Sequence, residues 1–347
     1  MGFSINKKDT SKPEGFSELK INWSGLHNNA DALAITEFAT ANPRILTVVL
    51  SQNSTSEERL FQALKFLAPT ELREKITRFP SWETLPYDIF SPHQDIISDR
   101  LSALDRLISQ APGILIISIH TLMQRIATKE YLAGSTFSFH KGDRLIIEDQ
   151  KMVLESAGYQ NSEIVSERGQ YATRGSILDI YPMGADLPIR LDLFDDEIDS
   201  LRSFDPTSQL TVKSLNSFTL LPAKEFPFDD EAIKKFRENW HNNFQGDVRR
   251  CSVYQDISSY ISPSGIESYL PFFFDETGSV FDCLPTNAFF FTQEKIMEIA
   301  SNFENEIEER WESLNYDIER PILKPGQLYL TNDELKTELT RFKTIEI

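Results

Sequence analysis

Two apolar runs that end in carboxylates are the residues best placed for phosphate chemistry. Residues 145–149 and 272–276 each close on an acidic pair, as does the strand that binds magnesium in nucleotide-hydrolysing domains. That arrangement works beside a GxxxxGK[ST] loop, whose glycines admit the phosphates and whose lysine neutralises their charge. No glycine in this chain is followed by lysine. We therefore interpret both runs as ordinary strand ends, and we expect neither a catalytic residue nor a cofactor.

The histidines, cysteines and clustered acids do not have the spacing of a metal site. The five histidines show neither i,i+4 nor HExxH spacing. The acidic cluster between Asp192 and Asp199 lacks the glycine and the alternating spacing of an EF-hand loop, so a solvated strand and turn is the better interpretation. Cys251 and Cys283 are too few for a disulfide framework, which makes a reducing cytoplasm the natural setting. We expect no bound metal.

One predicted strand, residues 189–194, carries an unusual outward face. With a side-chain period of two, its Ile and Leu residues face a core, whereas Arg190, Asp192 and Phe194 face the other way. A large apolar ring on that face needs a cover. Two interpretations stay open: a helix covers Phe194 and the charges are an ordinary cross-strand pair, or the face binds a partner. Arg174, just before the neighbouring strand, is expected near the same surface.

The elements around this strand form a predicted β-meander. Residues 177–181 are a second short strand, and residues 182–186 have the composition of a hairpin loop. Residues 150–157 have the pattern of an amphipathic helix, which Gly158 would end. The sequence therefore predicts a small α+β unit here.

The flanking segments predict a different architecture. Residues 45–50 and 114–119 are continuous apolar runs of strand length, which are typical of buried parallel strands. Helices are predicted at 30–41, at 96–108 and at 229–240 with Asp229 or Asp230 as N-cap. A further helix through Leu60, Leu64 and Leu67 has Ser54 or Ser56 as its candidate N-cap. A charged helix around 293–314 and aromatic strands at 272–274 and 289–291 follow. Strands that alternate with helices indicate a parallel α/β sheet.

Composition and charge narrow the class of protein. The 347 residues are 40% hydrophobic and 25% charged, which is a globular composition. The net charge of -18 argues against the whole chain acting as a non-specific nucleic-acid binder, because phosphate attraction needs clustered Lys and Arg. We find neither a signal peptide nor an apolar run of about 18 residues, and we expect no membrane partner.

Several segments together resemble a known family. Residues 168–182 with 190–198, including Arg168, Tyr171 and Arg174, resemble the second domain of the excision-repair helicase UvrB. Residues 82–88, 91–101 and 121–125 are similar to the amino-terminal UvrB-like module of the bacterial transcription-repair coupling factor (Mfd) in particular. The similarity runs from about Leu46 to Trp240.

The resemblance implies a fold and a division of the chain. It implies an α/β protein in which a degenerate helicase-like (P-loop-type) parallel sheet domain is split by an inserted small α+β domain. Residues 23–30 stand where UvrB has its phosphate loop, so the nucleotide site is expected to be lost. Residues 82–91 are too short for the aromatic hairpin that guides damaged DNA in UvrB. We expect a flexible tail (1–18), the first part of the helicase-like domain (19–135), the insertion (136–220) and the second part (221–347), which completes the sheet.

The resemblance also implies partners. Arg174, Arg190, Asp192 and Phe194 match positions that bind the damage-recognition ATPase UvrA, although UvrB proteins often carry a further arginine where this chain has Ala172. In the family, the carboxy-terminal domain masks this surface intramolecularly. Contacts with RNA polymerase and DNA, and ATP hydrolysis, belong to domains outside these residues.

Three functions from different classes follow from these observations. The first is a module that recruits UvrA, for which Arg190→Glu is predicted to abolish binding without unfolding the chain. The second is an active UvrB-like ATPase that binds DNA, which the missing Gly-Lys pair opposes. The third is a structural or autoinhibitory scaffold for the translocase domains, which would not bind UvrA.

Overall fold

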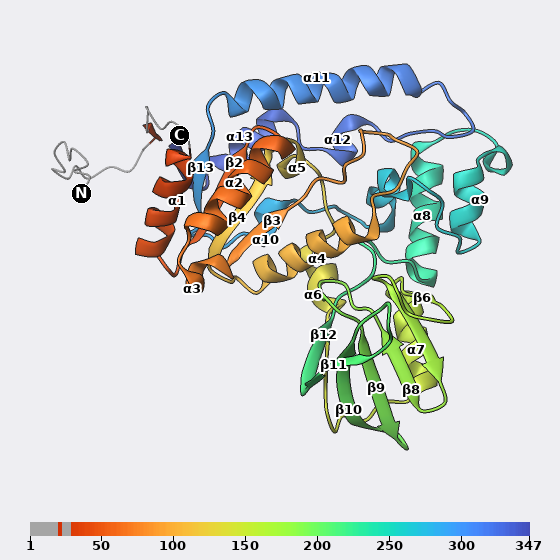
Figure 1. Cartoon of the computed structure of the whole chain (residues 1–347). Helices are drawn as coiled ribbons and strands as arrows, with labels where there is room; N and C mark the ends of the chain where they lie inside the picture. The colour runs from red at the N-terminus through yellow and green to blue at the C-terminus, as the bar shows by residue number, and fades with distance from the viewer. Residues whose placement is uncertain (1–19, 23–28) are drawn as a thin grey trace.

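A computed structural model describes residues 20–22 and 29–347. The predicted tail, and most of the segment predicted to replace the phosphate loop, lie outside the described residues. Figure 1 shows a larger domain that contains both ends of the described chain, with a smaller domain, formed by the middle of the chain, projecting from it. The fold is therefore a mixed α/β domain that carries an insertion, as the sequence predicted.

The host domain is built on a six-stranded parallel sheet with the order β1-β14-β13-β2-β4-β3. Its central strands β2 and β4 are buried along their whole length, which confirms the predicted parallel strands. The carboxy-terminal part of the chain completes the sheet, because β13 lies between β2 and β14. The strands are β1 (Lys20–Asn22), β2 (Leu46–Ser51), β3 (Ile76–Phe79), β4 (Gly113–Ser118), β13 (Phe289–Thr292) and β14 (Lys343–Glu346).

Helices cover both faces of this sheet. Alternate residues of β4 divide between two cores: Ile114 and Ile116 pack under α1 and α2, whereas Leu115 and Ile117 pack under α4. The host helices are α1 (Ala30–Ala41), α2 (Ser54–Leu67), α3 (Thr70–Arg73), α4 (Gln94–Ile108), α5 (Ile119–Leu122), α6 (Lys129–Gly134), α8 (Asp230–Asn243), η1 (Val248–Arg250), α9 (Ser252–Ser258), η2 (Ile266–Phe273), α10 (Val280–Cys283), α11 (Ile296–Leu314), α12 (Pro325–Leu328) and α13 (Asn332–Leu339). None of the helices in the described ranges is both long and apolar enough to cross a membrane.

Three local predictions were wrong. Phe272 and Phe273 belong to the 3-10 helix η2, where they pack on Phe236 of α8, and do not form a strand. Residues 147–149 begin helix α7, so the apolar run at 145–149 is not the end of a strand either. The N-cap of α2 is Asn53, whose side chain accepts a hydrogen bond from the Ser56 amide. In the first two cases a short apolar run did not distinguish a buried helical turn from a strand.

The inserted domain is a second six-stranded sheet with the order β11-β10-β9-β8-β7-β6. Its neighbouring strands are antiparallel, except that β6 runs parallel to β7. Helix α7 (Ile147–Ser156) covers one face, where Leu154 joins the core with Leu178 and Leu191. The strands are β6 (Gln160–Asn161), β7 (Gln170–Arg174), β8 (Ile177–Ile180), β9 (Ile189–Phe194), β10 (Glu197–Phe204) and β11 (Thr211–Leu215).

A short two-stranded sheet forms the neck between the domains. Strand β5 (Phe137–His140) leads into the insertion and pairs with β12 (Ser217–Leu220), which leads out of it. The rings of Phe139 and Phe218 stack across the pair, with centroids 5.1 Å apart. Both crossings of the chain are thus held together in one element.

A buried ion pair fastens the return connection to the host domain. The Nε of Arg100 on α4 donates to Glu225 Oε1 at 2.6 Å, and both side chains are almost fully buried. Glu225 Oε2 accepts a hydrogen bond from Trp82 Nε1 at 2.8 Å. Arg100 Nη1 also donates to the carbonyl oxygen of Pro80 and to Gln124 Oε1. We refer to Trp82, Arg100 and Glu225 as the buried triad. Trp82 and Arg100 belong to residues 82–88 and 91–101, two of the segments that carry the family resemblance, so these segments have a structural role.

Direct hydrogen bonds further fix the insertion against α4. The amide of Gly184 donates to Ser98 Oγ at 2.7 Å, and Arg168 forms an ion pair with Asp95. Tyr159 donates its hydroxyl proton to the carbonyl oxygen of Leu221 at 2.7 Å. The insertion is therefore held on the host domain through the segment before β7 and the loop between β8 and β9.

Glu57, in the first turn of α2, is a buried carboxyl group beside the sheet. Its side chain is 3% exposed, and its Oε1 lies 3.7 Å from Arg78 Nε. Its Oε2 has no hydrogen-bond partner among the described residues. Burial raises the pKa of Glu57 to about 8, against the opposing effect of Arg78. The folded chain therefore holds a proton on this group at neutral pH.

The pKa of Glu57 predicts a pH dependence of stability. Between its ordinary pKa and about 8, the unfolded chain releases this proton while the folded chain retains it, so stability falls as the pH rises through this window. Relative to Glu57→Gln, the wild type is expected to lose up to about 1.4 kcal/mol per pH unit between pH 5 and pH 8. Urea unfolding of both proteins at several pH values measures this difference; parallel pH profiles would contradict it.

Candidate protein-binding surface

The outward face of β9 carries three of the four predicted site residues. Burial alternates along the strand, so that Ile189, Leu191 and Leu193 are buried and the residues between them are not. Arg190, Asp192 and Phe194 consequently lie on the face opposite α7. We call this face of the inserted sheet the meander surface.

The strand register brings Arg174 onto the same surface. Arg174 at the end of β7 lies opposite Ile177 on β8, and Ile177 lies opposite Asp192 on β9. Directly opposed residues of antiparallel strands point to the same face, so these three form one row. Two strand spacings place Arg174 and Asp192 roughly 10 Å apart. Arg174 is exposed, and its Nη2 donates to the carbonyl oxygen of Glu163 at 2.6 Å.

Arg190 is held rigidly by a neighbour on β8. Its Nε and Nη2 donate to the two carboxylate oxygens of Asp179 at 2.7 and 2.8 Å, and the Asp179 side chain is 3% exposed. The guanidinium also lies 4.6 Å from the centre of the Phe204 ring. Hydrogen bonding to Asp179 raises the pKa of Arg190. The arginine therefore reaches the surface already ordered.

This geometry argues against the expectation that Arg190→Glu leaves the fold intact. The substitution would place a second carboxylate beside the buried carboxylate of Asp179 and remove its counter-charge. Leaving one partner of a buried ion pair uncompensated costs about 3–5 kcal/mol. Loss of binding in that variant would be mixed with loss of stability, so other residues make better probes.

Asp192 also has partners within the sheet. Its Oδ2 accepts a hydrogen bond from Ser200 Oγ at 2.9 Å and pairs with Arg202, both from β10. Sequence reasoning missed Asp179 and Arg202. A carboxylate inside the apolar strand 177–181 was the available signal for Asp179, because a buried charge needs a partner.

Phe194 differs from its neighbours because the described residues leave it uncovered. The side chain is 76% exposed at the end of β9, and the helix of this domain lies on the other face. Of the two interpretations left open by the sequence, the first predicted cross-strand charge pairs and a helix over Phe194. The charge pairs are present, but no described helix covers Phe194. An exposed ring on the same strand face as an ordered arginine is the composition of a binding hot spot.

A small second core supports this surface from within. Val165, Ala172, Tyr181 and Phe204 form a buried cluster on the same side of the sheet as Arg190. The side chain of Gln209 connects the cluster to Arg190, since its Nε2 donates to the Val165 carbonyl oxygen and its Oε1 accepts from Arg190 Nη2 at 3.4 Å. The surface is therefore preorganised.

Comparison with known proteins connects this geometry to a family. Residues 137–226 match the family model described as "UvrB interaction domain". The transcription-repair-coupling factor of Haemophilus influenzae is 44% identical over 91% of this chain and 27% of its own length. The chain belongs to the UvrB-homology modules of the transcription-repair-coupling factors. The Escherichia coli protein is 42% identical over 79% of this chain and 24% of its own length. The corresponding Bacillus subtilis protein is 24% identical over 82% of this chain and 26% of its own length. The module spans about a quarter of the length of these relatives.

The described part of the UvrB-homology module contains no group of three His, Cys, Asp or Glu side chains able to hold a metal ion. His93 instead caps α4 by accepting a hydrogen bond from the Asp95 amide. His120 packs against the Phe303 ring, and burial lowers the pKa of this imidazole. These histidines have structural roles.

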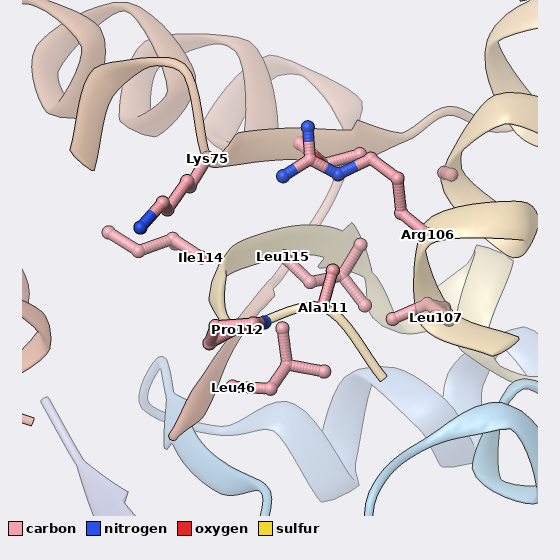
Figure 2. A pocket seen from close by; sticks show the side chains of 10 residues that line it. Leu46, Lys75, Arg106, Leu107, Ala111, Pro112, Ile114 and Leu115 are labelled. Atoms are coloured by element: carbon pink, nitrogen blue, oxygen red, sulfur yellow. The ribbon is translucent and has the colours of Figure 1, made fainter. Parts of the chain in front are cut away.

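Two hollows in the module are also explained by structure. A cavity of about 10 Å³ near the start of β4, lined by Lys75, Arg106 and Ile114 among others, is at the lower limit for one water molecule (Figure 2). An open groove of about 410 Å³ is lined by Arg125 and several acids. Of those acids, Glu334 pairs with Arg125 and Asp282 caps α10. Neither hollow competes with the meander surface as a site.

Proposed function

We propose that this module recruits UvrA through the meander surface, with Arg174, Arg190, Asp192 and Phe194 as contact residues. The observation that carries the proposal is Phe194, an uncovered aromatic ring beside charged side chains that are already ordered. The position of this surface within the segment similar to UvrB interaction domains supports the same conclusion.

Transcription-coupled repair is the proposed context. The relatives named as transcription-repair-coupling factors support a role in which the module brings UvrA to a stalled RNA polymerase. In this proposal, polymerase binding, DNA contact and ATP hydrolysis belong to other parts of the full-length protein, and the module itself is not an ATPase. In the full-length protein, the carboxy-terminal domain masks the meander surface until the protein engages RNA polymerase. The protein acts in the cytoplasm.

We also propose that the insertion occupies residues 136–220 and that residues 19–135 and 221–347 form one host domain. The neck supports these limits, since β5 begins at Phe137 and β12 ends at Leu220. The host domain serves to present the insertion.

A calorimetric titration of the module with UvrA tests the proposal. Arg174→Glu is expected to weaken binding at least tenfold at low salt and less at high salt, because an exposed charge at an interface acts through screened attraction. Lys213→Glu is the matched control, because it also reverses an exposed charge in the inserted sheet. Lys213 lies opposite Ser203, a buried residue on the face away from the meander surface.

The outcomes separate the three functions. Binding by the wild type that Arg174→Glu weakens and Lys213→Glu does not supports recruitment through the meander surface. A wild type that binds nucleotide instead would support the ATPase. Absence of binding to both UvrA and nucleotide would leave the scaffold.

A further inference from the structure

Arg202 on β10 is a second arginine of the meander surface. The register places it directly opposite Arg190, so the two side chains lie on the same face of neighbouring strands. Its side chain is 35% exposed, compared with 20% for Arg190. Two guanidinium groups side by side repel each other unless anions are close to both.

Each arginine has one aspartate, but the two pairs differ in strength of attachment. Asp179 accepts hydrogen bonds from both Nε and Nη2 of Arg190, whereas Asp192 accepts one from Nη2 of Arg202. The Nε of Arg202 is buried without a hydrogen-bond partner among the described residues. Among the described residues Arg202 thus makes one hydrogen bond where Arg190 makes three, so its outer nitrogens are less engaged by the protein itself.

The charges of this surface favour an acidic group from outside. The two rows of the register that cross β7 to β10 carry the arginines Arg174, Arg190 and Arg202 against Asp179 and Asp192. This excess of positive charge occurs in a chain whose net charge is -18. The planar fork of an arginine matches the geometry of a carboxylate, which is the anionic group that an unmodified protein partner presents.

We propose that Arg202 is a specificity-determining residue of the binding surface, and that Arg202 and Arg190 together receive a carboxylate side chain of the partner protein. This inference rests on the proposed function. Phe194 supplies an apolar contact at the end of the same strand, four residues from Arg190, and the arginine pair selects an acidic residue of the partner at its own position on the surface.

The test compares Arg202→Gln with the wild type in titrations against UvrA at two salt concentrations. Glutamine keeps an N–H donor for Asp192 and removes the positive charge. Affinity is expected to fall at least tenfold, with a smaller salt dependence than in the wild type, while the urea unfolding midpoint stays close to that of the wild type. Arg249→Gln is the matched control, because Arg249 also pairs with an aspartate, Asp247, but lies in the host domain.

Each outcome decides the matter. If the wild type binds UvrA and Arg202→Gln binds equally well with the same salt dependence, the inference is overturned and the recruitment function stands. If the wild type does not bind, both fail. If Arg202→Gln does not fold, Arg202→Lys decides, since lysine keeps the charge beside Asp192 but has no planar fork: wild-type affinity overturns the inference, and at least a fivefold loss supports it.

Discussion

Glu225→Ala is expected to lower the free energy of unfolding of this module by about 3–5 kcal/mol. The substitution leaves Arg100, whose side chain is 0% exposed, without its counter-charge and removes the acceptor for Trp82 Nε1. A cation in that position cannot regain hydration without opening the contact between α4 and the return connection. Urea unfolding followed by tryptophan fluorescence measures the change in midpoint.

Two further variants separate the ion pair from general damage. Glu238→Ala removes a carboxylate that is 59% exposed and paired with the exposed Lys234, and it is expected to change stability by less than about 0.5 kcal/mol. The double variant Arg100→Met with Glu225→Leu is expected to recover much of the loss, because no buried charge is left alone. A Glu225→Ala protein as stable as the wild type would show that the buried triad does not fasten the domains.

Phe194→Ala is expected to weaken UvrA binding by about 2 kcal/mol, or roughly thirtyfold. The ring is 76% exposed in the free chain, so its removal should leave stability within about 0.5 kcal/mol of the wild type. Calorimetric titration measures the affinity, and urea unfolding confirms that the variant is folded.

Met152→Ala is the matched control for that experiment. Met152 is 64% exposed and lies on α7, on the opposite side of the inserted sheet from Phe194. Truncation there should leave the affinity unchanged. If both variants bind as the wild type does, the aromatic ring is not an anchor and the meander surface loses its main support.

Local patterns predicted the fold where one physical cause dominates. The alternation in β9 predicted the outward triplet, because a single buried face imposes a period of two. The continuous apolar runs of β2 and β4 predicted parallel strands, because both faces of those strands are buried. The aromatic run at Phe272 was misassigned because a buried 3-10 turn has the same composition as a short buried strand.

The partners of the site residues required the three-dimensional register. Asp179 and Arg202 are 23 positions apart in sequence, yet they flank Arg190 on its two neighbouring strands. The buried triad is a more distant case, since Glu225 lies 125 residues from Arg100. No local pattern reveals such pairs, so sequence alone predicted which residues face outward but not how they are held.

The nesting of the domains sets an order for synthesis of the chain. Every strand of the inserted sheet has been made once Leu215 has left the ribosome. Strand β2 of the host sheet, although made much earlier, has no second neighbour until β13 is made, and β13 itself pairs with β14 at residues 343–346. Contacts of such long sequence separation form late. The surface that carries Phe194 can thus be complete while the domain that supports it is still an unfinished nascent chain.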